Sequence, residues 1–529
     1  MRFRTLLTGI LLLLAITPSL WLVLRNPDFP QFGIFNDDSV YYANAQSLAQ
    51  GQGYRIPSHP GSPYQAKYPP LFPLFLSIAW KLQPEFPANL ALALKLVWLL
   101  IPVFMILCWR ALRDYELGPV EAASLCLWIG VSPIFNLMSL SLLCELFASV
   151  LILAAILSIE RASKNDSVIW SVAAGILAAG CCLTKSGALP ILVSAPLGFW
   201  LSRERRLIAP FLAASLPIAA AWQIWVATHK NPSSEEYVGS YFSYLGQMHL
   251  PSVFLINFDQ VLTGIAGFLF YIFSEQWWGE LLAWVVCIAG ISGVVRLVRR
   301  SGRWHFAIFA ICYGGLMVIW NGVVGPRMTL ELLPIAAAGI YSEAKHFVSL
   351  CAVNLRQARI ADRCAAVVMI ALVAAFTVYS GVVIYGGMTS YVPSVLASQR
   401  IWWQASAPVF NWIRNNTPAD TRFYANNETM LYLRTGRRGF SMPLTPPLRY
   451  DSPAKKSAYL NHLPEVIRRN NGTHALLLLG DVSPDLGDNG RNVALSAIEK
   501  DPDFREIFRY SEAVVYEVRS GRSQAVAAR

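Results

Sequence analysis

Two adjacent acidic residues, Asp37 and Asp38, open a segment with helical character that runs to about Gln50 and stops at Gly51 and Gly53. A carboxylate in such a place can act as a general base or orient a nucleophile by its charge. The structural alternative is a helix N-cap, a role that Asp fills well. One Asp is enough for a cap, so capping leaves the second one unexplained. We therefore take this acidic pair as the candidate catalytic residues.

Three cations stand beside apolar segments elsewhere in the chain. Lys67 lies in Lys-Tyr-Pro-Pro-Leu, Lys185 in Leu-Thr-Lys-Ser-Gly, and Arg327 in Gly-Pro-Arg. Each of them could be a membrane anchor whose charge reaches the lipid head groups. Three cations from three separate loops suit one anionic head group better than three independent anchors, and the guanidinium fork of Arg suits phosphate especially well. They are the candidate ligands of a lipid phosphate.

The composition favours a membrane protein as the setting for this chemistry. The chain has 529 residues, of which 55% are hydrophobic and 14% are charged, and its mean hydropathy is +0.43. A soluble domain is about 45–50% apolar and about 25% charged. The balance excludes a soluble globular enzyme, a disordered chain and a disulfide scaffold. The net charge of +11 does not indicate nucleic acid, because the basic residues cluster at the ends of apolar segments.

Apolar runs of sufficient length recur along the chain and predict about eleven transmembrane spans. An N-terminal run to Leu24 resembles a signal peptide, but its length and the lack of an A-x-A site favour a retained helix. Two long stretches with one charge each, Glu145 and Lys185, read as helical hairpins. The predicted spans cover residues 1–24, 88–109, 122–159 (two), 167–202 (two), 207–228, 280–295, 306–326, 328–344 and 365–386. The uncharged run 260–274 is interpreted as a re-entrant or juxtamembrane helix.

The distribution of basic residues predicts which side each loop faces. Clusters such as Arg296–Arg303 mark the cytoplasmic side, so the N-terminus is expected inside and the C-terminus outside. Under this topology the candidate charges share the outer boundary of the membrane: Asp37, Asp38, Lys67, Glu145, Lys185 and Arg327. A random scatter would divide them between both faces. Glu145 can be a helix-packing hydrogen bonder or an acidic pocket residue, whereas Glu331 is interpreted as structural.

The chain divides into a membrane module, residues 1–386, and a C-terminal segment, residues 387–529. The first large external loop is 25–88. The C-terminal segment carries 18 Lys/Arg and 13 Asp/Glu and is rich in Asn, Gly and Pro, which predicts a small extracytoplasmic α/β domain. Strands are expected at Arg422–Ala425, His474–Leu479 and Ala513–Val518, and helices at 404–415, 453–470 and 490–500. The fold class is thus a polytopic α-helical membrane protein with an added α/β domain.

The order of these motifs resembles the GT-C class of membrane glycosyltransferases, in particular the aminoarabinose lipid A transferases and protein O-mannosyltransferases. The resemblance covers about residues 1–345. It is carried by Asp-Asp-x-x-Tyr-Tyr at residues 37–42, Gly-x-Gly-Tyr at 51–54, Lys-Tyr-Pro-Pro-Leu at 67–71 and Leu-Thr-Lys at 183–185. The family has Lys-Pro-Pro-Leu, so Tyr68 is an insertion here. A later Arg-plus-Leu-Pro element is matched by Arg327 and Leu333-Pro334.

The resemblance implies roles for these residues. In the family the first acidic residue is catalytic, which corresponds to Asp37 with Asp38 beside it. The family's basic residues contact the lipid phosphate or the acidic residue, which corresponds to Lys67, Lys185 and Arg327. Further members of the pocket are expected to be Tyr41, Tyr42, Tyr68 and Glu145. The implied donor is a sugar on a polyprenyl phosphate, undecaprenyl in a bacterial inner membrane.

The expected reaction is transfer of that sugar to an acceptor hydroxyl on the outer face, with inversion. Adjacent carboxylates do not form a D-x-D motif, and nucleotide-binding and zinc-protease motifs are missing, so no metal or other cofactor is predicted. The partners are membrane lipids, the lipid-linked sugar and a glycan, lipid or protein acceptor. Two alternatives stay open: a lipid or sugar transporter or flippase, which needs polar residues at mid-bilayer, and a glycan polymerase or ligase of another fold.

Overall fold

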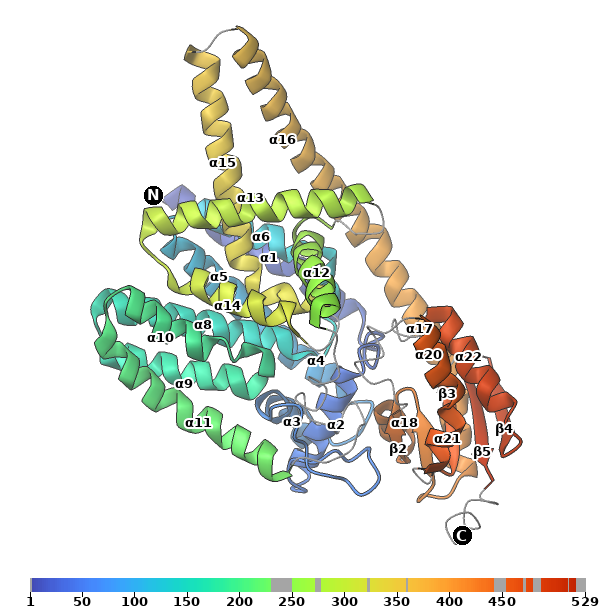
Figure 1. Ribbon diagram of the computed structural model, residues 1–529. Coiled ribbons are helices and arrows are strands. Elements are labelled where there is room, and N and C mark those ends of the chain that lie inside the picture. Colours follow the sequence, from blue (N-terminus) through green and yellow to red (C-terminus); the bar gives the residue numbers. More distant parts are fainter. Residues whose placement is uncertain are drawn as a thin grey trace. The chain divides into compact units, whose positions relative to one another are not determined.

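The computed structural model describes residues 2–229, 250–271, 277–320, 324–357, 360–441, 453–469, 472–478, 487–511 and 513–519. The chain packs as two compact units (Figure 1). The first unit comprises residues 1–27, 94–222 and 253–395, and the second comprises 28–93, 223–252 and 396–529. Segment 28–93, expected as a loop of the membrane module, therefore packs with the C-terminal region.

Helices make up the first unit, and several of them are long enough to cross a membrane. Seven helices of the described chain qualify by length and composition, which confirms a multi-pass membrane protein. The predicted total of about eleven spans stays a prediction, because several other apolar helices have only 10–17 residues. The helices up to α11 are α1 (Arg2–Arg25), α4 (Leu90–Trp98), α5 (Leu100–Asp114), α6 (Pro119–Gly130), α7 (Pro133–Met138), α8 (Cys144–Asn165), α9 (Val168–Thr184), η1 (Ser186–Ala188), α10 (Ile191–Leu201), η2 (Arg205–Leu207) and α11 (Ile208–His229).

The first stretch predicted as a hairpin, 122–159, is divided among α6, α7 and α8, with Glu145 in the first turn of α8. The second, 167–202, forms α9, η1 and α10, with Lys185 directly after α9. Helix α8 packs mainly along α9, so the two predicted hairpins stay a prediction. The remaining elements of this half are α12 (Leu250–Phe270), α13 (Trp277–Ser301), α14 (His305–Val318), η4 (Pro326–Leu332), α15 (Leu333–Gln357), α16 (Ile360–Gly386) and the π-helical η5 (Gly387–Tyr391). The span expected over 328–344 begins instead as the 3₁₀ segment η4. Pro334 explains the change, since proline is tolerated only in the first turn of an α-helix.

Helix α12 is longer than the 15-residue run from which a re-entrant helix was predicted. It has 21 residues and qualifies as a candidate span. Asp259 ended the uncharged run in the sequence, but its carboxylate accepts a hydrogen bond from Trp284 Nε1 at 3.0 Å. A residue of α13 thus partners the Asp259 carboxylate, so α12 can continue through this position.

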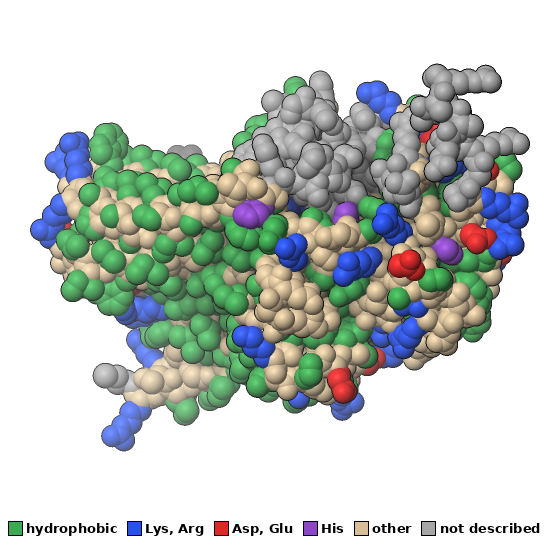
Figure 2. Space-filling view, turned by 90° about the horizontal axis from the view of Figure 1, so that it is seen from below, with side chains coloured by type: hydrophobic (Ala, Val, Ile, Leu, Met, Phe, Trp, Pro, Cys, Tyr) green, Lys and Arg blue, Asp and Glu red, His purple; other side chains and the backbone are tan. Residues whose placement is uncertain are grey.

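Exposed apolar side chains cover the outer surfaces of the first unit's helices. Ile169 and Ile176 of α9 and Val193 of α10 are more than half exposed. In Figure 2, hydrophobic side chains are dense over the left part of the face shown, and Lys and Arg lie at its left edge and over the centre and right of the face. Apolar exposure on this scale is typical of a lipid-facing surface.

Helices α13 and α15 approach each other closely enough to fix the position of η4. A Cβ atom on Gly293 would lie 1.8 Å from the main-chain oxygen of Gly339, and one on Gly339 would lie 2.2 Å from that of Gly290. Small residues allow such backbone contact between membrane helices. Because η4 runs directly into α15, this contact holds the residues of η4 in place.

A five-stranded sheet lies at the centre of the second unit's C-terminal region. Its order is β2-β1-β3-β5-β4, with β1 parallel to β2 and β3, and β5 antiparallel to β3 and β4. The strands are β1 (Arg422–Ala425), β2 (Arg438–Ser441), β3 (His474–Leu478), β4 (Phe504–Tyr510) and β5 (Ala513–Val518). The three predicted strands are confirmed, and β2 and β4 are additional.

Alternate side chains of the strands form two cores, one on each face of the sheet. Tyr424, Leu477 and Tyr516 pack against α20 (Pro453–Asn461), α21 (Leu463–Arg469) and α22 (Gly487–Glu499). Phe423 and Val515 pack against α17 (Val392–Asn416) and α18 (Glu428–Thr435). Helices α2 (Asp37–Ala49) and α3 (Leu71–Leu82) of segment 28–93 complete the second unit.

Candidate active site

The acidic pair begins helix α2, as expected, but its two members have different surroundings. Asp38 is fully buried, and its carboxylate accepts hydrogen bonds from the main-chain N–H of Gly33 at 2.9 Å and of Ser39 at 2.7 Å. Asp37 is partly exposed, and its Oδ1 accepts a hydrogen bond from the Tyr68 hydroxyl at 2.6 Å. Asp38 therefore ties the local backbone together, whereas Asp37 presents a carboxylate that a substrate can reach.

The capping interpretation of the acidic pair is wrong. The N-cap position of α2 is Asn36, and its side chain makes no capping hydrogen bond. Both aspartates lie in the first turn, where the positive end of the helix dipole stabilises negative charge. Helix α2 ends before Gln50, and Gly51 follows with φ of 72°, a conformation that favours glycine.

The Lys-Tyr-Pro-Pro-Leu segment is brought against α2 by tyrosines. The Tyr54 hydroxyl donates to the main-chain oxygens of Tyr68 at 2.8 Å and Pro69 at 3.2 Å. The ring of Tyr41, one turn into α2, meets the Tyr68 ring edge-on at 5.0 Å between centroids. These contacts fix the Tyr68 hydroxyl at Asp37. The inserted Tyr thus touches the candidate catalytic carboxylate.

Lys67 lies next to this contact. It is buried, and its Nζ is 5.6 Å from the centre of the Tyr68 ring. Its main-chain N–H donates to Oε1 of Gln65 at 2.8 Å, which holds the turn. Lys67, Tyr68, Tyr41 and Asp37 are therefore brought together within the second unit.

Tyr42 is placed differently from the other pocket candidates. It is fully buried, and its ring packs against Trp80 at 4.9 Å and Phe32 at 5.6 Å. Its main-chain oxygen accepts from Trp80 Nε1 at 3.0 Å. The structure thus places Tyr42 in an aromatic core that supports α2.

A second group of predicted residues meets in the first unit, and we call Lys185, Glu331, Glu145 and Arg327 the buried charge cluster. Lys185 Nζ lies 2.8 Å from Glu331 Oε1, 3.9 Å from Glu145 Oε1 and 3.2 Å from the Tyr313 hydroxyl. Arg327 Nε lies 3.8 Å from the same Glu145 oxygen. Three helical segments that are distant in sequence, α8, the α9 end and η4, therefore converge on these charges.

Exposure differs within the buried charge cluster. The side chain of Glu331 is 0% exposed, Glu145 5%, Lys185 9% and Arg327 26%. The two cations balance the two carboxylates, so Lys185 serves first as a partner for buried Glu. Arg327 is the member most accessible to an anionic ligand. Sequence reasoning missed Glu331 as the partner of Lys185, because nothing local connects positions 146 residues apart.

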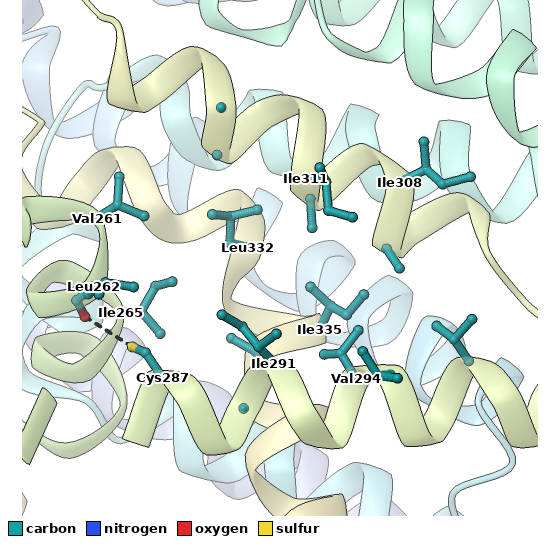
Figure 3. Close-up of a pocket in the computed structure, with 18 of the residues that line it drawn as sticks. Val261, Leu262, Ile265, Cys287, Ile291, Val294, Ile308, Ile311, Leu332 and Ile335 are labelled. Carbon is teal, nitrogen blue, oxygen red and sulfur yellow. Dashed lines mark hydrogen bonds between the residues drawn. The ribbon is translucent and has the colours of Figure 1, made fainter. Parts of the chain in front are cut away.

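The first unit also contains an apolar groove of about 670 Å³ (Figure 3). Its walls come from α12, α13, α14 and the η4–α15 junction, with Val261, Ile291, Ile311 and Leu332 among the side chains that point into it. Leu332, which lines the groove, is the last residue of η4 and directly follows Glu331.

The predicted site residues thus form two groups, one in each unit. Asp37, Asp38, Lys67, Tyr41 and Tyr68 belong to the second unit, and Glu145, Lys185 and Arg327 belong to the first.

Solved structures with a similar fold are known. No protein-family model matches the sequence, and no curated protein matches it. ArnT from Cupriavidus metallidurans, solved bound to undecaprenyl phosphate, aligns over 94% of this chain and 97% of its own with 13% identity and a TM-score of 0.50. The archaeal oligosaccharyltransferase AglB from Archaeoglobus fulgidus, solved with an inhibitory peptide and a dolichol-phosphate, aligns over 96% of this chain and 74% of its own with 12% identity and a TM-score of 0.57.

Both similar structures belong to one structural class, and both alignments cover nearly the whole of this chain. The expectation from the motifs Asp-Asp-x-x-Tyr-Tyr and Lys-Tyr-Pro-Pro-Leu is confirmed at the level of the fold. The chain is a multi-pass membrane protein with the fold of the GT-C glycosyltransferases.

Proposed function

We propose that this protein transfers a sugar from a polyprenyl-phosphate donor to an acceptor hydroxyl on the outer face of the membrane. The observation that carries the proposal is the partly exposed carboxylate of Asp37, held by the Tyr68 hydroxyl at the start of α2. The fold supports it, since ArnT and AglB have been solved with polyprenyl-type phosphates bound. The N-terminus and the clusters of Lys and Arg would face the cytoplasm.

Asp37 is the proposed general base. The positive end of helix α2 favours its ionised form. One of its oxygens accepts from Tyr68, and the partial exposure of the side chain leaves room for an acceptor hydroxyl. Positioned bases of this kind contribute about 10²–10⁴-fold to rate.

The proposed step is a single displacement at the anomeric carbon. The acceptor oxygen forms a bond to that carbon while the bond from the carbon to the phosphate oxygen breaks. The acceptor proton passes to Asp37, and both bonding electrons of the broken bond leave with the polyprenyl phosphate. Attack and departure on opposite faces invert the configuration of the sugar.

The departing phosphate gains negative charge, which fixed cations can stabilise. The proposal assigns this role first to Lys67, which lies beside Tyr68 and Asp37 within the second unit. Lys185 and Arg327 of the buried charge cluster are the further cations that the motif resemblance implies, and Arg327 is the most exposed member of its cluster. The apolar groove of the first unit offers about 670 Å³ for part of the polyprenyl chain.

The test is sugar transfer by the purified protein in lipid nanodiscs. Synthetic polyprenyl-phosphate sugars are offered with native membrane extract as acceptor, and products are identified by mass. Asp37→Asn should lower transfer by about 10²-fold or more, while Asp28→Asn, the same change elsewhere in segment 28–93, should not. Wild-type transfer by folded, inserted Asp37→Asn and Asp38→Asn variants would exclude the mechanism. Movement of a lipid or sugar across vesicles without any transfer would favour the transporter.

A further inference from the structure

Segment 28–93 is bound along its length by helices of the C-terminal region within the second unit. Trp403 Nε1 of α17 donates to the main-chain oxygen of Pro30 at 3.1 Å. Gly33 lies so close to α17 and α18 that a Cβ atom there would come within 2.8 Å of Trp403 and 2.9 Å of Met430. The residues just before the acidic pair therefore rest directly on the C-terminal region.

Asn427 connects the two parts by hydrogen bonds. It is 1% exposed, and its Nδ2 donates to the main-chain oxygen of Gly33 at 2.8 Å and to Oδ1 of Asn36 at 2.6 Å. Its Oδ1 accepts from the main-chain N–H of Met430 at 3.1 Å, which caps α18. One buried side chain thus serves both α18 and the backbone that leads into Asp37.

That backbone is strained. The N–H of Asp37 donates to the main-chain oxygen of Phe35 at 2.5 Å, and Asn36 between them has φ of 54° and ψ of −48°. This is a γ-turn of the rare type with positive φ. A non-glycine residue keeps such a conformation only where its surroundings enforce it. Two side chains bond to Asn36: the Ser39 hydroxyl donates to its main-chain oxygen at 2.7 Å, and the Asn427 amide donates to its side chain at 2.6 Å.

We propose that Asn427 is a positioning residue for catalysis: by holding the γ-turn at Asn36, it sets the orientation of the Asp37 carboxylate. This inference rests on the proposed function, since it assumes that Asp37 is the reacting base. It gives the C-terminal region a part in building the catalytic site. Asn427 itself does not touch substrate.

The test separates the two bonding roles of Asn427. Asn427→Ser and Asn427→Asp keep an oxygen that can cap α18 but remove the amide donor. Both variants should lower kcat by about tenfold, while KM for the lipid donor stays within about twofold, because a small misplacement of a reacting group costs rate. Asn416→Asp is the matched control, since that amide donates only to Trp412 of its own helix.

Hydrogen exchange measured by mass spectrometry gives a readout independent of activity. Amides of residues 33–39 should exchange faster in Asn427→Ser and Asn427→Asp than in wild type and Asn416→Asp, with α22 unchanged. Unaltered exchange at 33–39 would overturn the positioning role, whether or not sugar transfer is observed. A wild-type protein without transfer activity would instead contradict the proposed function. Hydrogen exchange at residues 33–39 would then still show whether Asn427 holds the turn at Asn36.

Asn36→Gly provides a further variant that does not disturb α18. Glycine accepts positive φ without strain, so the turn then needs less enforcement. In this background, removal of the Asn427 amide should lower kcat by a smaller factor than it does in the wild type. Equal factors in both backgrounds would show that Asn427 does not act through the turn.

Discussion

The two groups of charges differ in what holds their carboxylates. In the buried charge cluster, Glu331 and Glu145 lie against the cations Lys185 and Arg327. At the start of α2, Asp38 accepts from two main-chain N–H groups and Asp37 accepts from a hydroxyl. Cations neutralise a carboxylate, whereas hydrogen bonds from a hydroxyl or from main-chain N–H groups orient it.

The difference separates stability from chemistry. A buried ion pair stabilises the fold chiefly because breaking it leaves a charge without a partner. The Asp37 carboxylate is partly exposed, so a substrate can reach it. Substitutions in the buried charge cluster should therefore act first on unfolding, and substitutions around Asp37 should act first on transfer.

The largest expected effect is on stability, from Lys185→Met. It leaves Glu331, which is 0% exposed, without its cation at 2.8 Å, and should lower the free energy of unfolding by about 3–5 kcal/mol. The double variant Lys185→Met with Glu331→Leu removes both charges and should recover part of this loss. Thermal unfolding in detergent measures both. A single variant as stable as wild type would break the comparison between the two groups.

Tyr68→Phe should have the next largest effect, and on transfer. It removes the hydroxyl that donates to Asp37 at 2.6 Å while keeping the ring contact with Tyr41. A hydrogen bond to a charged group contributes about 1.5–3 kcal/mol, so the transfer rate should fall about tenfold or more with unfolding little changed. Tyr64→Phe, in the same segment, is the control and should transfer at the wild-type rate. Loss of stability without loss of rate would contradict the assignment.

Arg327 sharpens the comparison, because it belongs to the buried charge cluster but is 26% exposed. Its partial exposure lets solvent screen the charges that it meets, so Arg327→Gln should change stability by about 1 kcal/mol. If Arg327 binds phosphate, Arg327→Gln should raise KM for the lipid donor about fivefold. Arg327→Lys should raise KM by less, because lysine keeps the positive charge but lacks the paired N–H donors of the guanidinium group. Initial rates over a range of donor concentrations measure this. An unchanged KM would remove Arg327 from the phosphate site.

The smallest expected effect is a pH dependence at Asp28. Its carboxylate accepts from Arg400 Nη2 at 2.9 Å, and this hydrogen bond lowers the pKa of Asp28 below its usual value of 3.8. A lowered pKa stabilises the folded state above the unfolded-state value, and the contribution is lost as pH falls through the lowered one. Arg400→Gln should therefore lower the unfolding temperature slightly at pH 7, and the difference from wild type should vanish at strongly acidic pH. If the difference in unfolding temperature between Arg400→Gln and wild type grew as the pH fell, the expected sign of the effect would be wrong.

Much of the fold follows from local pattern. The apolar runs predicted helical segments at α8 and α9, and the acidic pair with its glycines predicted α2 almost to the residue. Strand β4 was missed because its sequence, Phe-Arg-Glu-Ile-Phe-Arg-Tyr, has a largely exposed pattern that does not alternate clearly. Strand β2 was missed because it has only four residues.

The partners of the site residues could not be predicted in the same way. The acidic pair, Lys67 and Lys185 are visible as charges beside apolar segments. Glu331 as the partner of Lys185 and Asn427 as the support of Asn36 depend on contacts across 146 and 391 residues. No local propensity records such contacts, because they exist only after the chain has folded.

The bond between Asn427 and Gly33 has a consequence for the order in which the protein is made. Its ends are 394 residues apart. A ribosome that adds about 5–20 residues per second needs roughly 20–80 s to travel between them. During that time the turn at Asn36 and the acidic pair that follows it exist without the hydrogen bonds from Asn427. If Asn427 orients Asp37, a chain that stalls before residue 427 contains Asp37 but cannot hold its carboxylate in the catalytic orientation. Activity then requires synthesis of the C-terminal region.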